Sequence, residues 1–247
     1  MSRSRVTPKK AAKKTSKRTA GIVAKKKLIV AIDGPAGSGK STVTHLVARE
    51  LGYAHIDTGA LYRAVALRAL ESGTSLDDGA ALGRLAEASL PEFRWLSDRN
   101  HIFIDDEDVS SRIRTPEISS AASTVSAHPE VREALLGLQR RLGQRGGVVL
   151  EGRDIGTVVF PRADVKFFLF ASVESRAQRR LTELESKGIY TSFKEVKKQV
   201  IARDKADSER KVAPLKKAKD AIEIDSTDLT IDAVVIKMVD IVRRGQG

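Results

Sequence analysis

Short continuous apolar runs alternate with segments of helical periodicity along most of this chain. Residues 28–32 form a short, continuous apolar run, as expected of a strand buried on both faces. Residues 53–56 predict a second strand, and 148–150, 165–170 and 221–224 are further candidates for buried strands. Three segments have the periodicity of amphipathic helices: residues 40–51, 59–72 and 231–242. This alternation predicts an α/β fold, a three-layer αβα arrangement with a mainly parallel five-stranded sheet.

Two segments break the alternation. Residues 77–128 contain the apolar stretches 93–95 and 101–104, which predict short antiparallel strands in a small insertion. Residues 174–210 are strongly charged and have a helical pattern, which predicts a short helical lid. Insertions of this kind often bind a second ligand or close over the first. We therefore expect one domain at 28–247, with a core formed by residues 28–76, 129–173 and 211–247.

Composition limits the chemistry and the location of the chain. Hydrophobic residues make up 41% of its 247 residues, which is enough for a proper core. The absence of Cys excludes disulfides, zinc–cysteine sites and thiolate catalysis, and it suits a reducing, cytoplasmic location. No apolar stretch approaches the length of a membrane span, and the sequence has no signal-peptide core, so we expect no membrane association.

The net charge of +12 is concentrated at the N-terminus. Residues 1–27 contain 11 of the 44 Lys and Arg residues and no Asp or Glu, which leaves 33 basic against 32 acidic residues for the rest. Such a segment cannot bury enough apolar surface to order itself, so we predict a disordered basic tail. The favoured interpretation is a solvated extension. Weak, nonspecific attraction to polyanions such as RNA is an alternative, and a transit peptide is a third that the lack of an apolar face disfavours.

A glycine-rich motif joins the first predicted strand to the first predicted helix. It is a complete P-loop, and its two flanks are those that the motif requires. The glycines let backbone amides converge on phosphate oxygens, Lys40 can reach the outer phosphates, and the Ser41 hydroxyl can ligate Mg²⁺. A turn that merely connects strand to helix is disfavoured by the complete motif. We therefore predict a nucleoside triphosphate site formed by Gly34, Pro35, Ala36, Gly37, Ser38, Gly39, Lys40, Ser41 and Thr42.

The first candidates for a phosphate-acceptor site lie in and after the segment 57–63. Thr58 opens the second predicted helix, and Arg63 lies one turn later on the same side. An N-capped helix with a surface arginine would show the same pattern. A second set is weak by itself: Arg112, Arg114, Ser123 and Arg132.

Two stronger clusters follow later in the chain. Residues 151–161 begin directly after a predicted strand, where an unpaired buried charge is costly. Arg153 and Asp154 are neighbours on an extended segment and point opposite ways, so each should meet a different partner, for example a phosphate and a base. On the helix at 203–210, Asp207 could contact a ligand or pair with an arginine three or four residues away.

Together these motifs resemble the bacterial type of the cytidylate kinase family. The likeness covers residues 28–243 and rests on five segments in the family's order: 34–42, 57–63, 151–161, 176–180 and 203–215. The run Glu-Gly-Arg-Asp-Ile-Gly-Thr-Val-Val-Phe-Pro at 151–161 is far more specific than the P-loop. The insertion at 77–128 fits the bacterial type as its segment for binding a nucleoside monophosphate, whereas the basic tail lies outside the resemblance.

The resemblance implies transfer of the γ-phosphate of ATP to CMP or dCMP, giving CDP or dCDP, in pyrimidine nucleotide metabolism. It implies a monomer that uses Mg²⁺, with Ser41 as a metal ligand. Lys40, Arg153 and Arg180 would be catalytic, and the lid that closes over ATP would contain Arg176 and Arg180. The remaining residues would bind the acceptor: Arg63 and Arg153 its phosphate, Thr58, Ser123, Arg132, Asp154 and Arg210 the cytosine, and Arg203 and Asp207 the sugar.

The chemistry of these side chains suits a cytosine. A carboxylate such as Asp154 can accept a hydrogen bond from the exocyclic amino group, and Arg132 and Arg210 can donate to the ring acceptors. Two other functions stay open at this point. Another small-molecule P-loop kinase would differ only in its acceptor pocket, whereas a nucleotide-dependent switch or an RNA-binding protein would rely on the basic tail.

Overall fold

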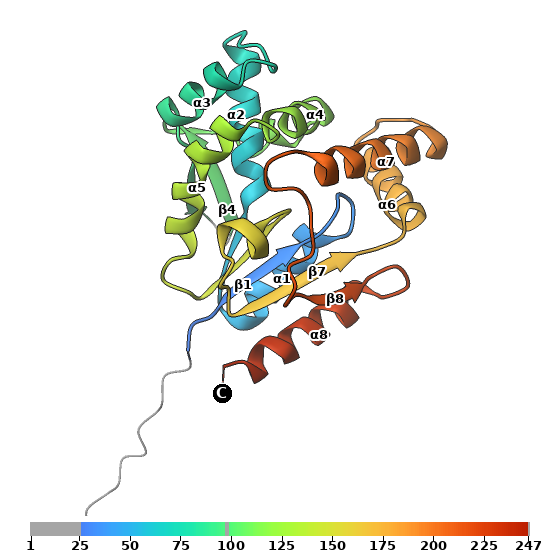
Figure 1. Ribbon diagram of the computed structural model, residues 1–247. Coiled ribbons are helices and arrows are strands. Elements are labelled where there is room, and N and C mark those ends of the chain that lie inside the picture. Colours follow the sequence, from blue (N-terminus) through green and yellow to red (C-terminus); the bar gives the residue numbers. More distant parts are fainter. Residues whose placement is uncertain (1–25, 97–98, 247) are drawn as a thin grey trace, which may run out of the picture.

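The computed structural model describes residues 26–96 and 99–246 (Figure 1). Its centre is a parallel sheet of five strands in the order β2-β6-β1-β7-β8. The strands are β1 (Ile29–Asp33), β2 (Ala54–Asp57), β6 (Val148–Gly152), β7 (Val165–Phe170) and β8 (Ile222–Asp225). The predicted α/β class and five-stranded parallel sheet are confirmed, and each strand begins within one residue of its predicted run.

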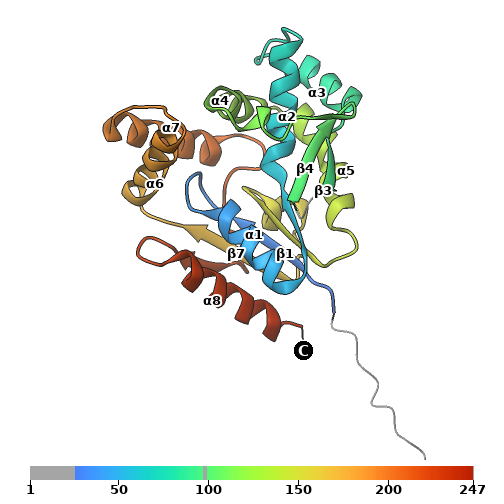
Figure 2. The ribbon, with the colours of Figure 1, turned by 180° about the vertical axis from the view of Figure 1, so that it is seen from behind.

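Helices cover both faces of this sheet, which gives the three predicted layers (Figure 2). One face carries α1 (Lys40–Leu51) and α8 (Ile231–Arg244), and the other carries α5 (Pro129–Gly143) and the helical turn η2 (Ile155–Val159). Successive residues of β1 point to opposite layers: Ile32 packs in the cluster with α1 and α8, whereas Ala31 packs in the cluster with η2. Burial on both faces explains why β1 and β6 begin as continuous apolar runs. The edge strands β2 and β8 are partly exposed, and the expectation of a buried strand at 221–224 is wrong except at Ile224.

The predicted insertion contains a small antiparallel sheet. The elements from β2 to α5 are α2 (Thr58–Glu71), α3 (Gly79–Ala88), β3 (Glu92–Leu96), β4 (Arg99–Ile104), β5 (Glu107–Asp108), η1 (Arg112–Arg114) and α4 (Pro116–Val125). β4 pairs antiparallel with both β3 and β5, as predicted. Leu61, Leu82 and Ile104 belong to one buried cluster, so α2 packs with the insertion. The exact boundaries of core, insertion and lid stay predictions.

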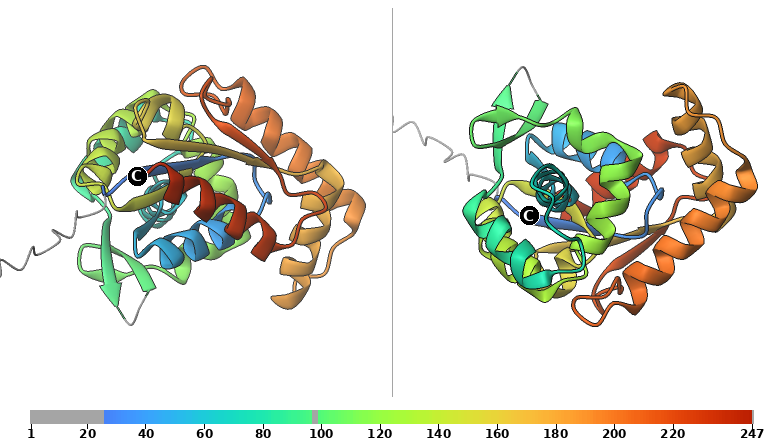
Figure 3. Two further views of the ribbon diagram at one scale, coloured as in Figure 1. Left: turned by 90° about the horizontal axis from the view of Figure 1, so that it is seen from below. Right: turned by 90° about the horizontal axis from the view of Figure 1, so that it is seen from above.

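The charged segment folds as two helices, α6 (Val173–Ser186) and α7 (Phe193–Glu209). They share a small apolar cluster of their own, which includes Leu184 and Val196. Seen from above, the orange α7 and the green α4 lie on opposite sides of the blue P-loop segment (Figure 3). No helix among the described residues is long and apolar enough to cross a membrane. Apart from Lys26 and Lys27, the predicted disordered tail lies outside the described residues.

Asp33, the last residue of β1, holds the loop that follows β6. Its Oδ1 accepts a hydrogen bond from the Ile155 amide at 2.8 Å, and its Oδ2 accepts one from the Gly156 amide at 2.7 Å. Asp33 is 4% exposed, and this burial raises the pKa of its carboxyl to about 6. Arg153 and Asp154 come directly before these two amides. The end of β1 therefore positions both the P-loop and these two candidate residues of the phosphate-acceptor site.

Candidate functional site

The P-loop connects β1 to α1 at the carboxyl edge of the sheet. Gly34 has a φ of +155° and Gly39 a φ of +87°, which lie in the region that favours glycine. A Cβ on Gly34 would lie 1.9 Å from the Leu169 carbonyl oxygen, so a side chain has no room there. These two positions explain why the turn needs glycine where the sequence has it.

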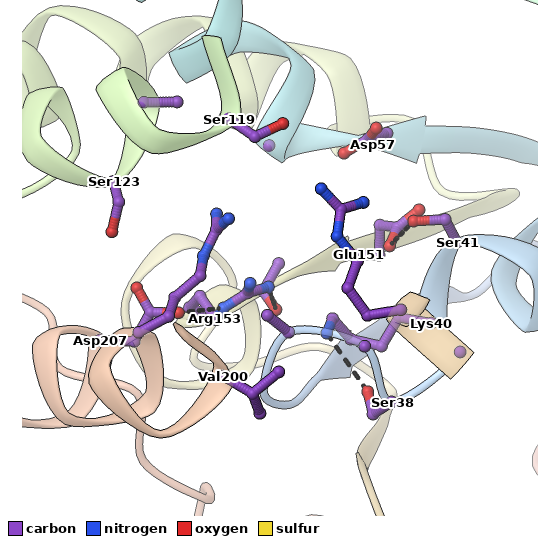
Figure 4. Close-up of a pocket in the computed structure, with 18 of the residues that line it drawn as sticks. Ser38, Lys40, Ser41, Asp57, Ser119, Ser123, Glu151, Arg153, Val200 and Asp207 are labelled. Carbon is purple, nitrogen blue, oxygen red and sulfur yellow. Dashed lines mark hydrogen bonds and ion pairs between the residues drawn. The ribbon is translucent and has the colours of Figure 1, made fainter. Parts of the chain in front are cut away.

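Lys40 folds over the loop from the first turn of α1. Its ammonium donates to the Pro35 carbonyl at 2.6 Å and to Ser38 Oγ at 3.4 Å (Figure 4). Burial, and then the nearby positive charge of Arg153, lower the pKa of Lys40 well below its usual value. Because Arg153 affects the pKa of Lys40, this candidate residue of the phosphate-acceptor site lies within electrostatic reach of the P-loop lysine.

Ser41 and Glu151 present oxygen atoms beside the P-loop. The Ser41 hydroxyl donates to Glu151 Oε2 at 2.8 Å (Figure 4). Within the described residues, no group of three or more His, Cys, Asp or Glu could hold a metal ion by itself. Mg²⁺ in phosphate-transfer sites keeps several waters and takes phosphate oxygens plus a few protein oxygens. A hydroxyl and a carboxylate side by side are hard oxygen donors, so these residues fit Mg²⁺.

One cavity of about 1310 Å³ opens beside the P-loop. Its volume exceeds the roughly 300–1,000 Å³ of a pocket for one small ligand, so it has room for two nucleotides. Of the predicted site residues it is lined by Ala36, Gly37, Ser38, Gly39, Lys40, Ser41, Thr42, Thr58, Arg63, Ser123, Arg132, Arg153, Asp154, Arg180, Arg203, Asp207 and Arg210. Arg114 also lines it, whereas Arg112 pairs with Glu71 and Glu107 at the surface.

Asp154 lies between two buried arginines. Its Oδ2 accepts a short hydrogen bond from Arg132, and its Oδ1 lies 3.5 Å from Arg210 Nη2. The Arg132 guanidinium also lies 5.3 Å from the centre of the Tyr62 ring, and Arg210 Nε donates to the Ala213 carbonyl at 2.7 Å. Three charged groups are thus held rigidly on one wall of the cavity, with acceptor and donor atoms side by side.

Asp207 pairs across the cavity and not along its own helix. Arg153 Nε donates to Asp207 Oδ2 at 2.7 Å (Figure 4), so the along-helix pair that spacing allowed for Asp207 is wrong. Burial opposes the charge on Asp207, but the charge and hydrogen bond of Arg153 hold its pKa below the usual value. The two neighbours Arg153 and Asp154 do meet different partners, as predicted from their extended backbone.

Arg203 and Arg63 each line the cavity with a buried Nε that lacks a partner among the described residues. Burial, and then the charge of Arg153, lower the pKa of Arg203 to about 10. Arg203 therefore stays charged at neutral pH and lines a cavity in which positive charges repel one another, which favours an anionic ligand.

The start of α2 holds two of the predicted residues. Asp57 caps the helix by accepting from the Ala60 amide at 3.2 Å, and it also pairs with Arg63 at 2.5 Å. Thr58 Oγ1 donates to the Glu151 carbonyl at 2.7 Å, which leaves its lone pairs free to accept from a ligand. The capped helix is present, but its arginine lines the cavity, as an acceptor site requires.

The lid arginines differ in position. Arg180 lines the cavity and pairs with Glu183 at 2.7 Å. Arg176 is not among the cavity-lining residues: it is 4% exposed, pairs with Asp204 at 2.6 Å, and donates to the Ala36 carbonyl at 3.2 Å. Arg176 therefore joins α6 both to α7 and to the backbone of the P-loop.

Sequence reasoning missed three contributors to the site. Arg179 lines the cavity and donates to the Ser226 carbonyl. It lies in the charged segment 174–210 that the sequence singled out, but no role was assigned to it. Glu151 lies in a segment that the sequence singled out at the end of a strand, but no role in the site was assigned to it. His55 lies 2.9 Å from Glu151, and no sequence signal marks it, because its partner is 96 residues away.

Residues 30–244 match the family model described as cytidylate kinase. A protein named cytidylate kinase from Citrifermentans bemidjiense is 52% identical over 208 residues, which cover 84% of this chain and 89% of that protein. Another of that name from a Geobacter species is 51% identical over 214 residues, covering 87% and 92%. Among solved structures, a shikimate kinase from Acinetobacter baumannii is 13% identical with a TM-score of 0.47, covering 90% of this chain and 96% of that one.

The attachment of the lid can be tested at Asp204. Asp204→Ala removes the counter-charge of the buried Arg176 and should lower the free energy of unfolding by about 3 kcal/mol, measured by urea denaturation. The matched control is Glu174→Ala, since Glu174 and Lys197 also join α6 to α7 at 2.7 Å but are exposed by 62% and 38%. Stability should hardly change there. Equal losses in both variants would contradict a specific role for the Arg176–Asp204 pair.

Proposed function

The chain belongs to the cytidylate kinase family, and we propose that it transfers the γ-phosphate of ATP to CMP or dCMP, giving ADP and CDP or dCDP. Membership confirms the family expected from the sequence and makes the protein a kinase. The observation that carries the proposal is one cavity lined by both the P-loop lysine and the Asp154 cluster. A phosphate donor on the first and a pyrimidine acceptor on the second would then face each other.

On the donor side, the P-loop amides and Lys40 would hold the outer phosphates of ATP. The ammonium of Lys40 has to leave the Pro35 carbonyl to do so, and a bound phosphate would restore the charged form that burial disfavours. Arg180 lies on the lid side of the cavity, where an arginine could neutralise charge on the transferred group. Phosphoryl transfer needs alignment and charge stabilisation above all, and these cations supply both.

Mg²⁺ would be held by Ser41 together with phosphate oxygens, with Glu151 beside it. When bound, it neutralises charge on the phosphates and helps to align them. The hydroxyl of Ser41 and the carboxylate of Glu151 are already 2.8 Å apart, so the protein brings its own oxygen donors to the edge of the phosphate site. Shielding of this region by α6 and α7 would keep water from taking the place of the acceptor.

On the acceptor side, Asp154 would accept from the amino group of cytosine while Arg132 and Arg210 donate to its ring acceptors. The carboxylate of Asp154 has about four lone pairs, so it can accept from a base while it pairs with both arginines. Uracil offers a carbonyl where cytosine has the amino group, and two acceptors would then face each other. Arg63 and Arg153 would bind the acceptor phosphate, and Arg203 and Asp207 the sugar.

An assay of ATP consumption with CMP, dCMP, UMP and AMP in parallel tests the acceptor. We expect CMP and dCMP to be phosphorylated with far higher kcat/KM than UMP, because one mismatched polar contact costs about 1–3 kcal/mol. Preference for UMP or AMP, or for none of the four, would favour another small-molecule P-loop kinase. We also propose that the protein is a monomer, as the resemblance implies. A cytoplasmic location, which the lack of Cys suits, is part of the same proposal.

Asp154 gives a sharper test of base recognition. Asp154→Ala should lower kcat/KM for CMP by about tenfold to hundredfold, the equivalent of one lost base contact, and leave the KM for ATP unchanged. Because alanine leaves Arg132 and Arg210 without their shared counter-charge, Asp154→Asn is measured beside it as the variant that keeps the shape. Unchanged CMP kinetics in both variants would remove Asp154 from the acceptor site.

The basic segment 1–27 is proposed to bind polyanions weakly and to play no part in phosphoryl transfer. Its charge would act through phosphate groups without reading sequence, so the binding should weaken steeply with salt. Deletion of residues 1–24 should therefore leave kcat and KM unchanged and weaken salt-sensitive retention on heparin. Loss of turnover in the deletion variant would show that the segment takes part in catalysis.

A further inference from the structure

A chain of hydrogen bonds reaches Ser41 from the small antiparallel sheet. Asn100 Nδ2, on β4, donates to the His55 carbonyl at 2.8 Å. The His55 ring, on β2, lies with Nε2 2.9 Å from Glu151 Oε1, and Glu151 Oε2 accepts from Ser41 Oγ at 2.8 Å. Four elements of the fold thus converge on one hydroxyl of the P-loop, and the proposed function described above uses only Ser41 and Glu151 of this chain of hydrogen bonds.

Glu151 is the centre of this chain and is held at both ends. It is 3% exposed at the end of β6, and the His55 side chain is 16% exposed. We assign the proton of the contact to His55 Nε2, because an ionised carboxylate only accepts hydrogen bonds. Each carboxylate oxygen then has one fixed donor, and Glu151 cannot rotate about its last bond without losing both contacts.

The orientation of Ser41 follows from that of Glu151. A hydroxyl has one hydrogen and two lone pairs. Since the hydrogen of Ser41 points to Glu151, the lone pairs are left for the cavity that Ser41 lines. A hydroxyl arranged in this way is a prepared ligand for a cation, and groups that orient a ligand in this way tune metal affinity.

We propose that His55 is a positioning residue for the metal site: it fixes Glu151, and Glu151 orients the Ser41 hydroxyl toward Mg²⁺ bound with the nucleotide. The proposal rests on the Mg²⁺–nucleotide part of the proposed function and does not depend on CMP as the acceptor. It extends the site by a side chain that touches neither substrate.

A purely structural role for His55 makes a different prediction. If the ring only shields a buried carboxylate, its loss should lower stability and weaken nucleotide binding whether or not metal is present. A positioning role acts through the metal, so only the gain in affinity that Mg²⁺ brings should fall. The ratio of ADP dissociation constants without and with Mg²⁺ separates the two roles and needs no turnover.

The experiment measures this ratio by calorimetry in the full-length protein. His55→Leu should lower the ratio by about tenfold, the low end of the effect of losing such an orienting partner, and leave metal-free ADP affinity unchanged. His55→Gln should keep most of the ratio, because its amide can donate to Glu151. The control is His101→Leu, which breaks a similar histidine–carboxylate pair, 2.7 Å from Asp108, on the small sheet. It should behave as the unaltered protein.

A double-mutant cycle with Ser41→Ala tests whether the effect passes through the hydroxyl. In the Ser41→Ala background, His55→Leu should lower the ratio no further. If His55→Leu does not fold, His55→Asn replaces it, since the shorter amide remains polar but cannot reach Glu151. The proposal is overturned by an unchanged ratio in the His55 variant, by an equal loss of metal-free affinity, or by full additivity with Ser41→Ala. These outcomes are independent of the nucleotide panel that decides the proposed function.

Discussion

The buried carboxylate of Asp33 is the constraint on which the site depends. It ends the central strand, and it receives two amides of the loop that follows the neighbouring strand. A side chain held by two backbone donors on a rigid sheet can shift little, so the loop carrying Arg153 and Asp154 keeps a fixed distance from the P-loop. Burial works against its charge and raises its pKa to about 6, which is tolerated because both oxygens have partners.

Electrostatics explains how so many arginines share one cavity. Arg132 and Arg210 share Asp154, and Arg153 has Asp207, so two carboxylates offset two of these three positive charges. Arg203 lacks a hydrogen-bond partner at Nε, and burial, and then repulsion by Arg153, lower its pKa to about 10. A phosphate group would relieve that repulsion, so affinity for an anion is a consequence of the fold's own charge distribution.

The sequence predicted what depends on local pattern and missed what depends on distant pairing. Strand β7 is apolar at every position except Lys166, and the P-loop has all its residues in one stretch, so both were predicted with their bounds. The partner of Asp207 was not, because spacing along a helix suggests neighbours, whereas burial turns the side chain toward Arg153, 54 residues away. The pairing of Arg176 with Asp204 was not predicted either, because Asp204 belongs to another helix.

Arg176 joins three separate parts of the chain beside the cavity. Its guanidinium links α6 both to Asp204 on α7 and to the Ala36 carbonyl of the P-loop, so the two charged helices and the phosphate loop meet at one buried charge. Separating these partners would leave an unpaired cation in the interior, which costs several kcal/mol. The contacts of Arg176 therefore also fix the place of Arg180, which lines the cavity one turn further along α6.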